Sequence, residues 1–339
     1  MNANEFSQIN TSISIKERTF LTGEQLNQLL HAKDDDQVYL LLQQMDYPLT
    51  VDMLQDTELI EEALMKTLAE EYAFAYEESP SADVVDIFAI KYMYHNLKVL
   101  LKSRATQLEF EQLLMPIGRY SLKALQHVVA TFEADSTSPL IAEEVKQTWQ
   151  EYVVYQDPEA ITIGMDSAYF RHLREISDFA QEEHVTSLIN AIIDFFNVIV
   201  VKRALEQNKP NSFMYELLSR KGSYTAKEFI DLVRNGELAT WFERLNPFIY
   251  ERDFDAYITK MKNGTITALE LETLADTFIH RLLEEGRMET SGVLPLLRYL
   301  NGKELEIKNL RLILTGRANR LDTEQITERM RPVYGERTI

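Results

Sequence analysis

The stretch Asn96-Leu97-Lys98-Val99-Leu100-Leu101-Lys102 recurs in altered form at Asn197-Val198-Ile199-Val200-Val201-Lys202-Arg203 and at Asn309-Leu310-Arg311-Leu312-Ile313-Leu314. Each copy begins with Asn and places apolar residues at +1, +3 and +4, on one face of a helix. A weaker copy begins at Asn10, with Ile13, Ile15, Lys16 and Arg18. Copies recur at roughly 100 residues, much longer than solenoid repeats of about 34 to 47 residues. The sequence therefore predicts three similar helical units, each a cluster of short helices followed by a long helical hairpin.

Helical spacing of apolar residues extends from these copies through most of the chain, which has only 11 Gly and 9 Pro in 339 residues. Six long helices are expected, over 59–76, 83–104, 167–182, from Thr186 or Ser187 to about 207, 267–285, and 293–317 with an interruption at Asn301-Gly302. Shorter helices are expected over 225–234 and 238–244. Val153–Tyr155 and Ile161–Ile163 are interpreted as extended loops, and no ladder of strands is expected. We therefore predict an all-α fold.

The repeat divides the chain into four spans. Residues 1–82 form a first helical repeat, 83–185 a second and 186–290 a third. Residues 291–339 are predicted to be C-terminal helices that close onto the first repeat. A helix of about 25 residues is roughly 40 Å long, so three such hairpins would make a tall, hollow or conical body.

The composition excludes several classes of protein. The formal net charge of −19 repels phosphate backbones, which argues against a nucleic-acid partner. The absence of Cys excludes a disulfide scaffold, thiolate metal ligands and a cysteine nucleophile. The most apolar stretch, Leu188–Val201, is shorter than the roughly 20 residues that span a bilayer and contains Asn190, Asp194 and Asn197. It is interpreted as a buried core helix, and no signal peptide is expected before it.

Motifs of catalysis and cofactor binding are missing. The sequence contains no HExxH, no GxxxxGK[ST] and no GxSxG. His280 and Glu284 are one helical turn apart and are interpreted as a surface pair. Asp34-Asp35-Asp36 resembles a magnesium-binding aspartate cluster, but no second cluster accompanies it and a loop is the preferred interpretation. We therefore predict no catalytic residues, no metal or cofactor site and no nucleotide binding.

Two polar features have two interpretations each. Asp52–Asp86 contains eleven acidic residues and the single base Lys66, and forms either a solvated helix face or a docking surface for a basic partner. Asn190, Asp194 and Asn197 form a stripe on the most apolar helix. These side chains either face an internal cavity or bridge buried backbone groups.

Several of these stretches resemble the C subunit of the V-type (archaeal-type) ATP synthase, which is the family of the eukaryotic V-ATPase d subunit. Phe88-Ala89-Ile90-Lys91-Tyr92 through Asn96–Lys102 resembles the central motif of that family. Pro295–Leu300 followed by Glu304–Arg311 resembles its C-terminal signature. Leu21-Thr22 and Leu26–Leu30, ending at Asp46-Tyr47-Pro48, fit its N-terminal region. The likeness extends over nearly the whole chain.

The resemblance implies a funnel-like, all-α body of three similar domains in the rotor of a V/A-type rotary ATPase. Such a protein is a socket that joins the central shaft, made of the D and F subunits, to the membrane proteolipid (c/K) ring. It transmits torque for ATP-coupled H⁺ or Na⁺ transport, is not an enzyme, and lies peripherally at the cytoplasmic face of the membrane. The alternative is a helical scaffold or adaptor protein with no role in an ATPase.

Overall fold

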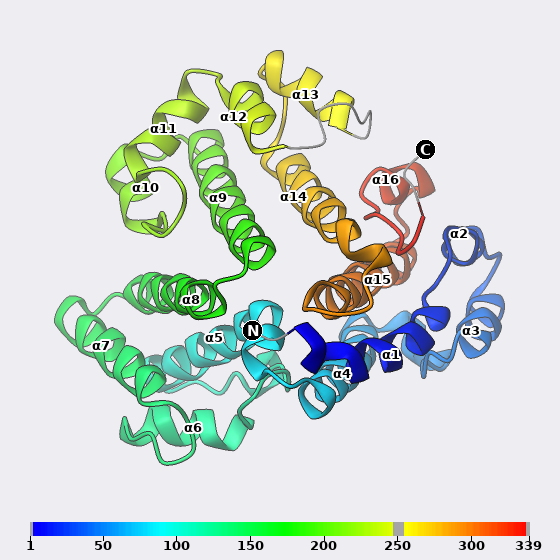
Figure 1. Cartoon of the computed structure of the whole chain (residues 1–339), viewed down its shortest axis with the longest axis horizontal. Coiled ribbons are helices and arrows are strands. Elements are labelled where there is room, and N and C mark those ends of the chain that lie inside the picture. The colour runs from blue at the N-terminus through cyan, green and yellow to red at the C-terminus, as the bar shows by residue number, and fades with distance from the viewer. Residues whose placement is uncertain (1–2, 247–253, 337–339) are drawn as a thin grey trace. The chain divides into compact units, whose positions relative to one another are not determined.

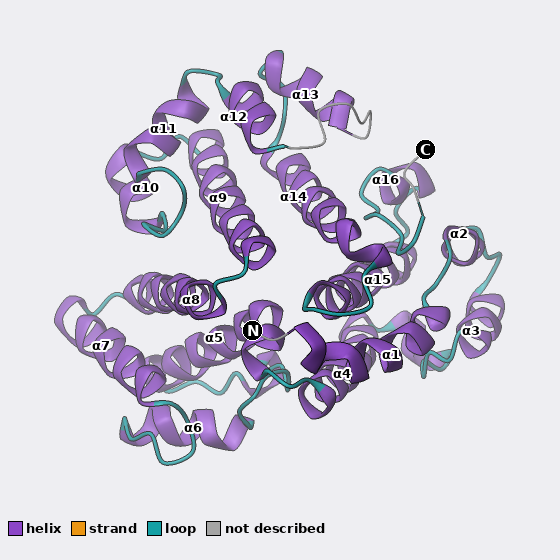
Figure 2. Ribbon diagram, in the orientation of Figure 1, coloured by secondary structure: helices purple, strands orange, loops and turns teal. Residues whose placement is uncertain are grey.

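The computed structural model describes residues 3–246 and 254–336, and throughout these ranges the secondary structure is helical (Figures 1 and 2). The elements run from α1 to α16 with short 3₁₀ turns between them, and no strand occurs in the described residues. The predicted all-α fold is confirmed. The chain divides into two compact units. Unit 1 holds residues 81–244 and 261–268, and unit 2 holds residues 2–80, 245–260 and 269–339.

The helices of unit 1 are α5 (Ala82–Thr106), α6 (Leu122–Thr131), α7 (Pro139–Tyr155), α8 (Pro158–Ala180), α9 (Glu183–Glu206), α10 (Asn211–Leu217), α11 (Ala226–Arg234) and α12 (Leu238–Leu245). Those of unit 2 are α1 (Ser7–Lys16), α2 (Gly23–Leu30), α3 (Asp35–Gln44), α4 (Thr57–Glu78), α14 (Ala268–Leu283), α15 (Leu294–Ala318) and α16 (Thr323–Thr327). Helix α13 (Asp255–Lys262) contributes residues to both units.

The core of unit 1 forms where α8 packs between α5 and α7 (Figure 1). Helices α5 and α8 run antiparallel, because Lys98 pairs with Asp166 at 2.6 Å while Tyr94, one turn earlier, lies against His172. Close packing of α8 on α7 depends on Gly164, where a Cβ atom would lie 2.6 Å from Thr148 Oγ1. Backbone approach of this kind requires glycine.

Helix α9 has the length and hydropathy of a membrane span, but 56% of that window is buried inside the protein. It packs against α8, α10 and α11 of unit 1. Leu188, Ile189, Ile193 and Val198 are fully buried there. Helix α9 is therefore a buried core helix, as the sequence predicts.

Unit 2 is built around α15, which packs against α1, α2 and α4. Most of its side chains are buried on every side, including charged ones. An amphipathic surface helix buries one stripe only, so α15 is the central helix of this unit. Segments from both ends of the sequence pack on it.

Three local predictions are wrong. Val153–Tyr155 are helical as the last turn of α7. Ile161–Ile163 are helical because Asp157 caps α8 by accepting from the Glu159 N–H at 2.9 Å and Pro158 occupies the first turn of α8. Helix α8 consequently begins at Pro158, nine residues before the predicted start. Asn301-Gly302 does not interrupt α15, and the missing side chain of Gly302 leaves room for the ring of Tyr334.

Candidate functional site

The three repeated Asn side chains make the same pair of hydrogen bonds to a following loop. Each side-chain amide donates to a backbone carbonyl and accepts from the N–H of the same residue. Asn96 clamps Met115 at 2.7 and 2.8 Å, Asn197 clamps Ser219 at 3.0 and 2.8 Å, and Asn309 clamps Arg331 at 3.1 and 2.7 Å. The Asn is almost fully buried in each case. A loop residue that is at least half-buried thereby satisfies both of its backbone polar groups without a strand or helix.

Asn10 of the weaker copy contacts its surroundings differently. Its Nδ2 donates to the carbonyls of Gly292 at 3.1 Å and Thr290 at 3.4 Å, and its Oδ1 accepts no hydrogen bond in the described structure. The reciprocal clamp on one loop residue is therefore restricted to the three stronger copies.

The polar stripe of α9 bridges loops, as the second of its two interpretations predicts. Asp194 Oδ1 accepts from the Ser223 N–H at 2.7 Å, beside the Asn197 clamp on Ser219. Asn190 Oδ1 accepts from Arg174 Nη2 at 2.8 Å. Burial raises the pKa of Asp194, and the bonds from Ser223 oppose that rise. These groups attach the α10–α11 region to the core helix.

Charged residues are buried inside α15, where the helical pattern alone would place apolar ones. Lys303, Glu304 and Glu306 are each 6% exposed. Glu306 accepts hydrogen bonds from the Leu21 N–H at 2.5 Å, the Tyr47 hydroxyl at 2.7 Å and Lys303 Nζ at 2.9 Å. Buried charges are tolerated only when they are paired and hydrogen-bonded. Glu306 thus fixes the N-terminal turn of unit 2 to its central helix.

A second buried ion network joins the two ends of the sequence. Arg298 lies between Glu17 at 2.7 Å and Glu284 at 2.6 Å, and its guanidinium stacks over the Tyr334 ring at 4.0 Å. The Tyr334 ring also stacks on Phe20 with centroids 3.8 Å apart, and its hydroxyl donates to Glu17. The C-terminal segment is therefore held against the N-terminal one through Arg298.

A groove of about 610 Å³ opens in unit 2 beside Lys303. Its walls come from the α1–α2 turn, the end of α3, α4 and α15, and include Arg18, Phe20, Thr22, Gln25, Asp46, Tyr47, Thr67 and Glu71. The ammonium of Lys303 lies 4.3 Å from the Phe20 ring centroid and is paired with Glu306. Two charged side chains of this groove, Lys303 and Glu71, are therefore used in internal pairs, with Glu306 and Lys16.

Two titratable groups of α14, half-buried Asp276 and buried His280, differ in charge state. Burial raises the pKa of Asp276, but Lys308 at 2.8 Å and Arg331 at 2.7 Å outweigh it and hold that pKa below its usual range. Burial lowers the pKa of His280 to about 4. The histidine is 4% exposed and neutral at pH 7. The surface pair predicted for His280 and Glu284 is therefore wrong, since Glu284 pairs with Arg298 instead.

The acidic segment Asp52–Asp86 is used partly for internal contacts. Asp56 caps α4, Glu61 pairs with Arg311 at 2.5 Å, and Glu71 pairs with Lys16 at 3.0 Å. Asp83 and Asp86 both pair with Arg119 in unit 1. Along α4 an exposed acidic stripe remains, consisting of Glu58, Glu62, Glu70 and Glu77, with Lys66 as the only base of this helix. The stripe is compatible with either interpretation of the segment.

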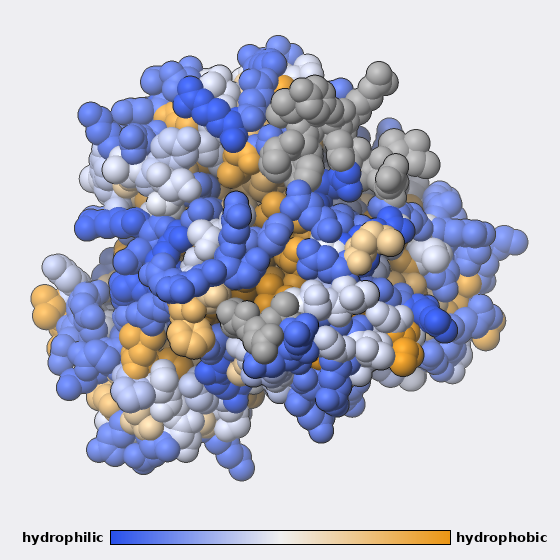
Figure 3. Space-filling model, viewed as in Figure 1, coloured by the Kyte–Doolittle hydropathy of each residue, from blue (hydrophilic) through white to orange (hydrophobic). Residues whose placement is uncertain are grey.

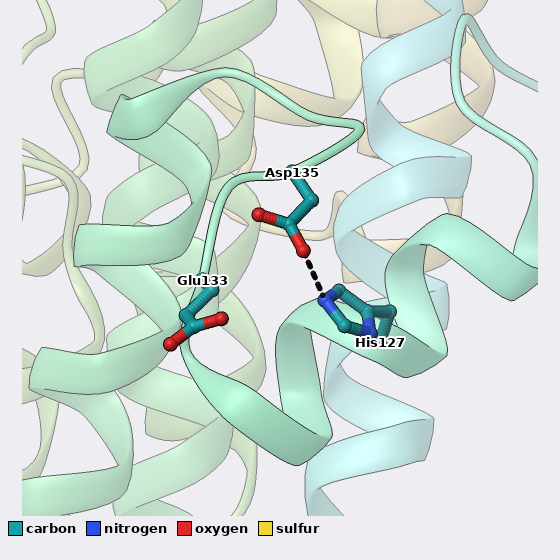
Figure 4. A group of neighbouring side chains, drawn as sticks. All are labelled: His127, Glu133 and Asp135. Carbon is teal, nitrogen blue, oxygen red and sulfur yellow. Dashed lines mark hydrogen bonds and ion pairs between the residues drawn. The ribbon is translucent and has the colours of Figure 1, made fainter.

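Two acidic groups have the residue types of a metal site. Asp34 caps α3 by accepting from the Gln37 N–H at 2.9 Å, and Asp35 accepts from Gln55, so the Asp34–Asp36 run serves the start of a helix. His127 of α6 lies close to Glu133 and Asp135 of the loop that follows, and His127 Nε2 is 3.1 Å from Asp135 Oδ2 (Figure 4). All three are exposed. This second group was not predicted, because its only signal in the sequence is the spacing His-x₅-Glu-x-Asp.

Fold and side chains together define an all-helical protein whose polar groups fasten its own helices and loops. Residues 9–329 match the ATP synthase (C/AC39) subunit family, and the chain therefore belongs to this family of V/A-type rotary ATPase subunits. It is 27% identical to the V-type sodium ATPase C subunit of Enterococcus hirae over 97% of this chain and 99% of that protein. It is 26% identical to the A-type ATP synthase C subunit of Methanocaldococcus jannaschii, over 95% of this chain and 85% of that protein.

Proposed function

We propose that this chain is a non-catalytic rotor subunit that joins the central shaft to the membrane proteolipid ring. The observation that carries the proposal is the end-to-end match to the C subunit of a sodium ATPase, which leaves neither protein with a large unmatched part. Torque transmission needs stiffness and broad contacts rather than a reaction pocket. Buried ion pairs and long packed helices supply stiffness.

The proposed body is a funnel of three similar domains, with the spans 1–82, 83–185 and 186–290 and a closing segment 291–339. Its support is the clamp that Asn96, Asn197 and Asn309 each make on the residue 19 or 22 positions later. The same two hydrogen bonds are expected at each strong copy of the repeat if the chain consists of three copies of one structural unit. The base of the funnel would sit on the ring and its open side would hold the D and F subunits.

In this proposal the chain acts at the cytoplasmic face of the membrane and binds neither nucleotide nor nucleic acid. It serves H⁺ or Na⁺ transport coupled to ATP, while the ion itself binds in the ring proteins. The acidic stripe of α4 is a candidate contact with a basic partner, because complementary charge sets orientation and association rate.

Co-purification from membranes tests the proposal. An affinity-tagged full-length chain, expressed in place of the native gene, is isolated from detergent-solubilised membranes and its partners are identified by mass spectrometry. We expect the D and F subunits and the proteolipid in constant ratio to the tagged chain. Recovery of unrelated signalling or trafficking proteins, without any component of the ATPase, would support a scaffold and overturn the rotor assignment.

A further inference from the structure

Apolar side chains are exposed at one end of unit 1, where α5 and α7 both end. Val153, Val154 and Tyr155, the last residues of α7, are 51%, 74% and 72% exposed, and Leu108 after α5 is 58% exposed. The space-filling view shows apolar side chains at this end of α7 (Figure 3). We refer to Leu108, Val153, Val154 and Tyr155 as the apolar tip.

Two contacts hold the parts of the apolar tip together. The Tyr152 hydroxyl donates to the Ala105 carbonyl at 3.4 Å, and the Arg104 guanidinium stacks over the Trp149 ring at 4.4 Å. The last turns of α5 and α7 are therefore side by side, and the apolar tip is one surface rather than two isolated spots.

The apolar tip is not required by the core of unit 1. Inward-facing residues of α7, such as Ile141 and Val145, are fully buried, whereas three successive residues at its end are exposed. Successive residues point about 100° apart on a helix, so the exposed part of this last turn is wide, and only the side of half-buried Tyr152 packs on α5. Contiguous exposed apolar side chains of this kind mark contact sites for other molecules.

The rim of the apolar tip is acidic. Glu109 and Glu111 follow α5, and Glu151, Asp157 and Glu159 flank the end of α7, all of them exposed. Neither 107–113 nor 151–159 contains a basic residue. Arg104, in the last turn of α5, stacks on the rings of Trp149 and Phe132. An acidic rim repels anionic lipid headgroups and attracts a partner that is rich in Lys and Arg.

We propose that the apolar tip is the surface that contacts the cytoplasmic loops of the membrane proteolipid ring, an inference that rests on the proposed function. Cytoplasmic loops of membrane proteins carry an excess of Lys and Arg. Such loops complement the acidic rim, while apolar residues between their charges bury the tip.

Binding measurements on the purified full-length chain test the assignment. The variant Val153→Gln/Val154→Gln/Tyr155→Gln keeps helix-forming residues at exposed positions and should unfold at the wild-type urea concentration. Detergent-solubilised proteolipid ring and purified DF shaft are the two probes. We expect the affinity for the ring to fall at least about tenfold, a loss of roughly 1.4 kcal/mol. The affinity for DF should be unchanged.

A matched control removes the same number of exposed apolar side chains elsewhere. Ile15, Leu40 and Met288 of unit 2 are 64%, 59% and 89% exposed. Their combined replacement by Gln should leave the affinity for the ring at the wild-type value. Replacement of Glu109 and Glu159 by Lys should weaken ring binding and reduce its dependence on salt.

Each other outcome has a definite meaning. Ring binding at wild-type affinity by the triple variant overturns the assignment, as does a loss confined to DF binding. Tip-dependent binding to vesicles of phosphatidylcholine and phosphatidylserine also overturns it, in favour of a lipid contact. If the wild-type chain binds neither the ring nor DF, the proposed function itself fails, which separates that failure from failure of the apolar tip.

Discussion

Replacement of Asn197 by Ala should destabilise the protein by about 2 to 4 kcal/mol. The Asn197 side chain is fully buried and makes two hydrogen bonds to Ser219, which is itself buried. Each buried hydrogen bond contributes about 1 kcal/mol net, and a backbone group left without a partner costs about 1 to 3 kcal/mol. Asn197→Asp should be at least as harmful at pH 7, because a carboxylate cannot donate to the Ser219 carbonyl.

Urea unfolding followed by circular dichroism measures this loss, with the slope of each transition compared between variants. Asn96→Ala and Asn309→Ala should lose similar amounts, since they remove the same two-bond clamp. Asn235 is exposed at the end of α11, and Asn235→Ala is the matched control, with an expected change within about 0.5 kcal/mol. A loss below about 1 kcal/mol for Asn197→Ala would refute the assignment of the clamp as a structural element.

Three further predictions concern buried and exposed charge. Glu306→Ala should cost about 3 to 5 kcal/mol in urea unfolding, because Lys303 is then left buried without its partner. Burial lowers the pKa of His280 in the folded chain to about 4, below its ordinary value of 6.5, so the unfolded chain binds a proton more readily than the folded one. The folded state therefore keeps its full stability above pH 6.5 and loses stability as the pH falls toward 4. Between pH 7 and pH 5 the wild type should lose about 2 kcal/mol more stability than His280→Gln, and equal losses would contradict the burial of a neutral imidazole. Single Lys replacements in the acidic stripe of α4 should change partner binding by less than about 1 kcal/mol, whereas Glu58, Glu62, Glu70 and Glu77 replaced together should weaken it much more if the stripe is a docking surface.

Local signals made the long helices predictable. The expected helices over 59–76 and 83–104 lie within two residues of the observed α4 and α5, since Asp56 caps the first and Ser79-Pro80-Ser81 separates them. The start of α8 was missed because β-branched Ile161 and Ile163 outweighed the Asp157-Pro158 start signal. Propensity is a weak prior that context overrides.

Contacts between distant parts of the sequence were not predictable. The repeat singled out Asn96, Asn197 and Asn309, but nothing local shows that each clamps a loop residue. Two buried carboxylates of α15 accept hydrogen bonds from distant parts of the sequence, Glu304 from Tyr72, 232 residues away, and Glu306 from Leu21, 285 residues away. Helical periodicity in the local sequence predicts that such charged residues face the solvent.

Coupling of ATP hydrolysis to ion transport tests the central proposal most directly. In a strain that lacks this chain, ATP hydrolysis by assembled heads and ion uptake by membrane vesicles are measured together. Heads that contain the D and F subunits should still hydrolyse ATP, because the proposed function gives this chain no catalytic site. ATP-driven ion uptake should be lost and should return with the wild-type gene. Uptake at the normal rate per assembled complex without this chain would contradict the coupling role.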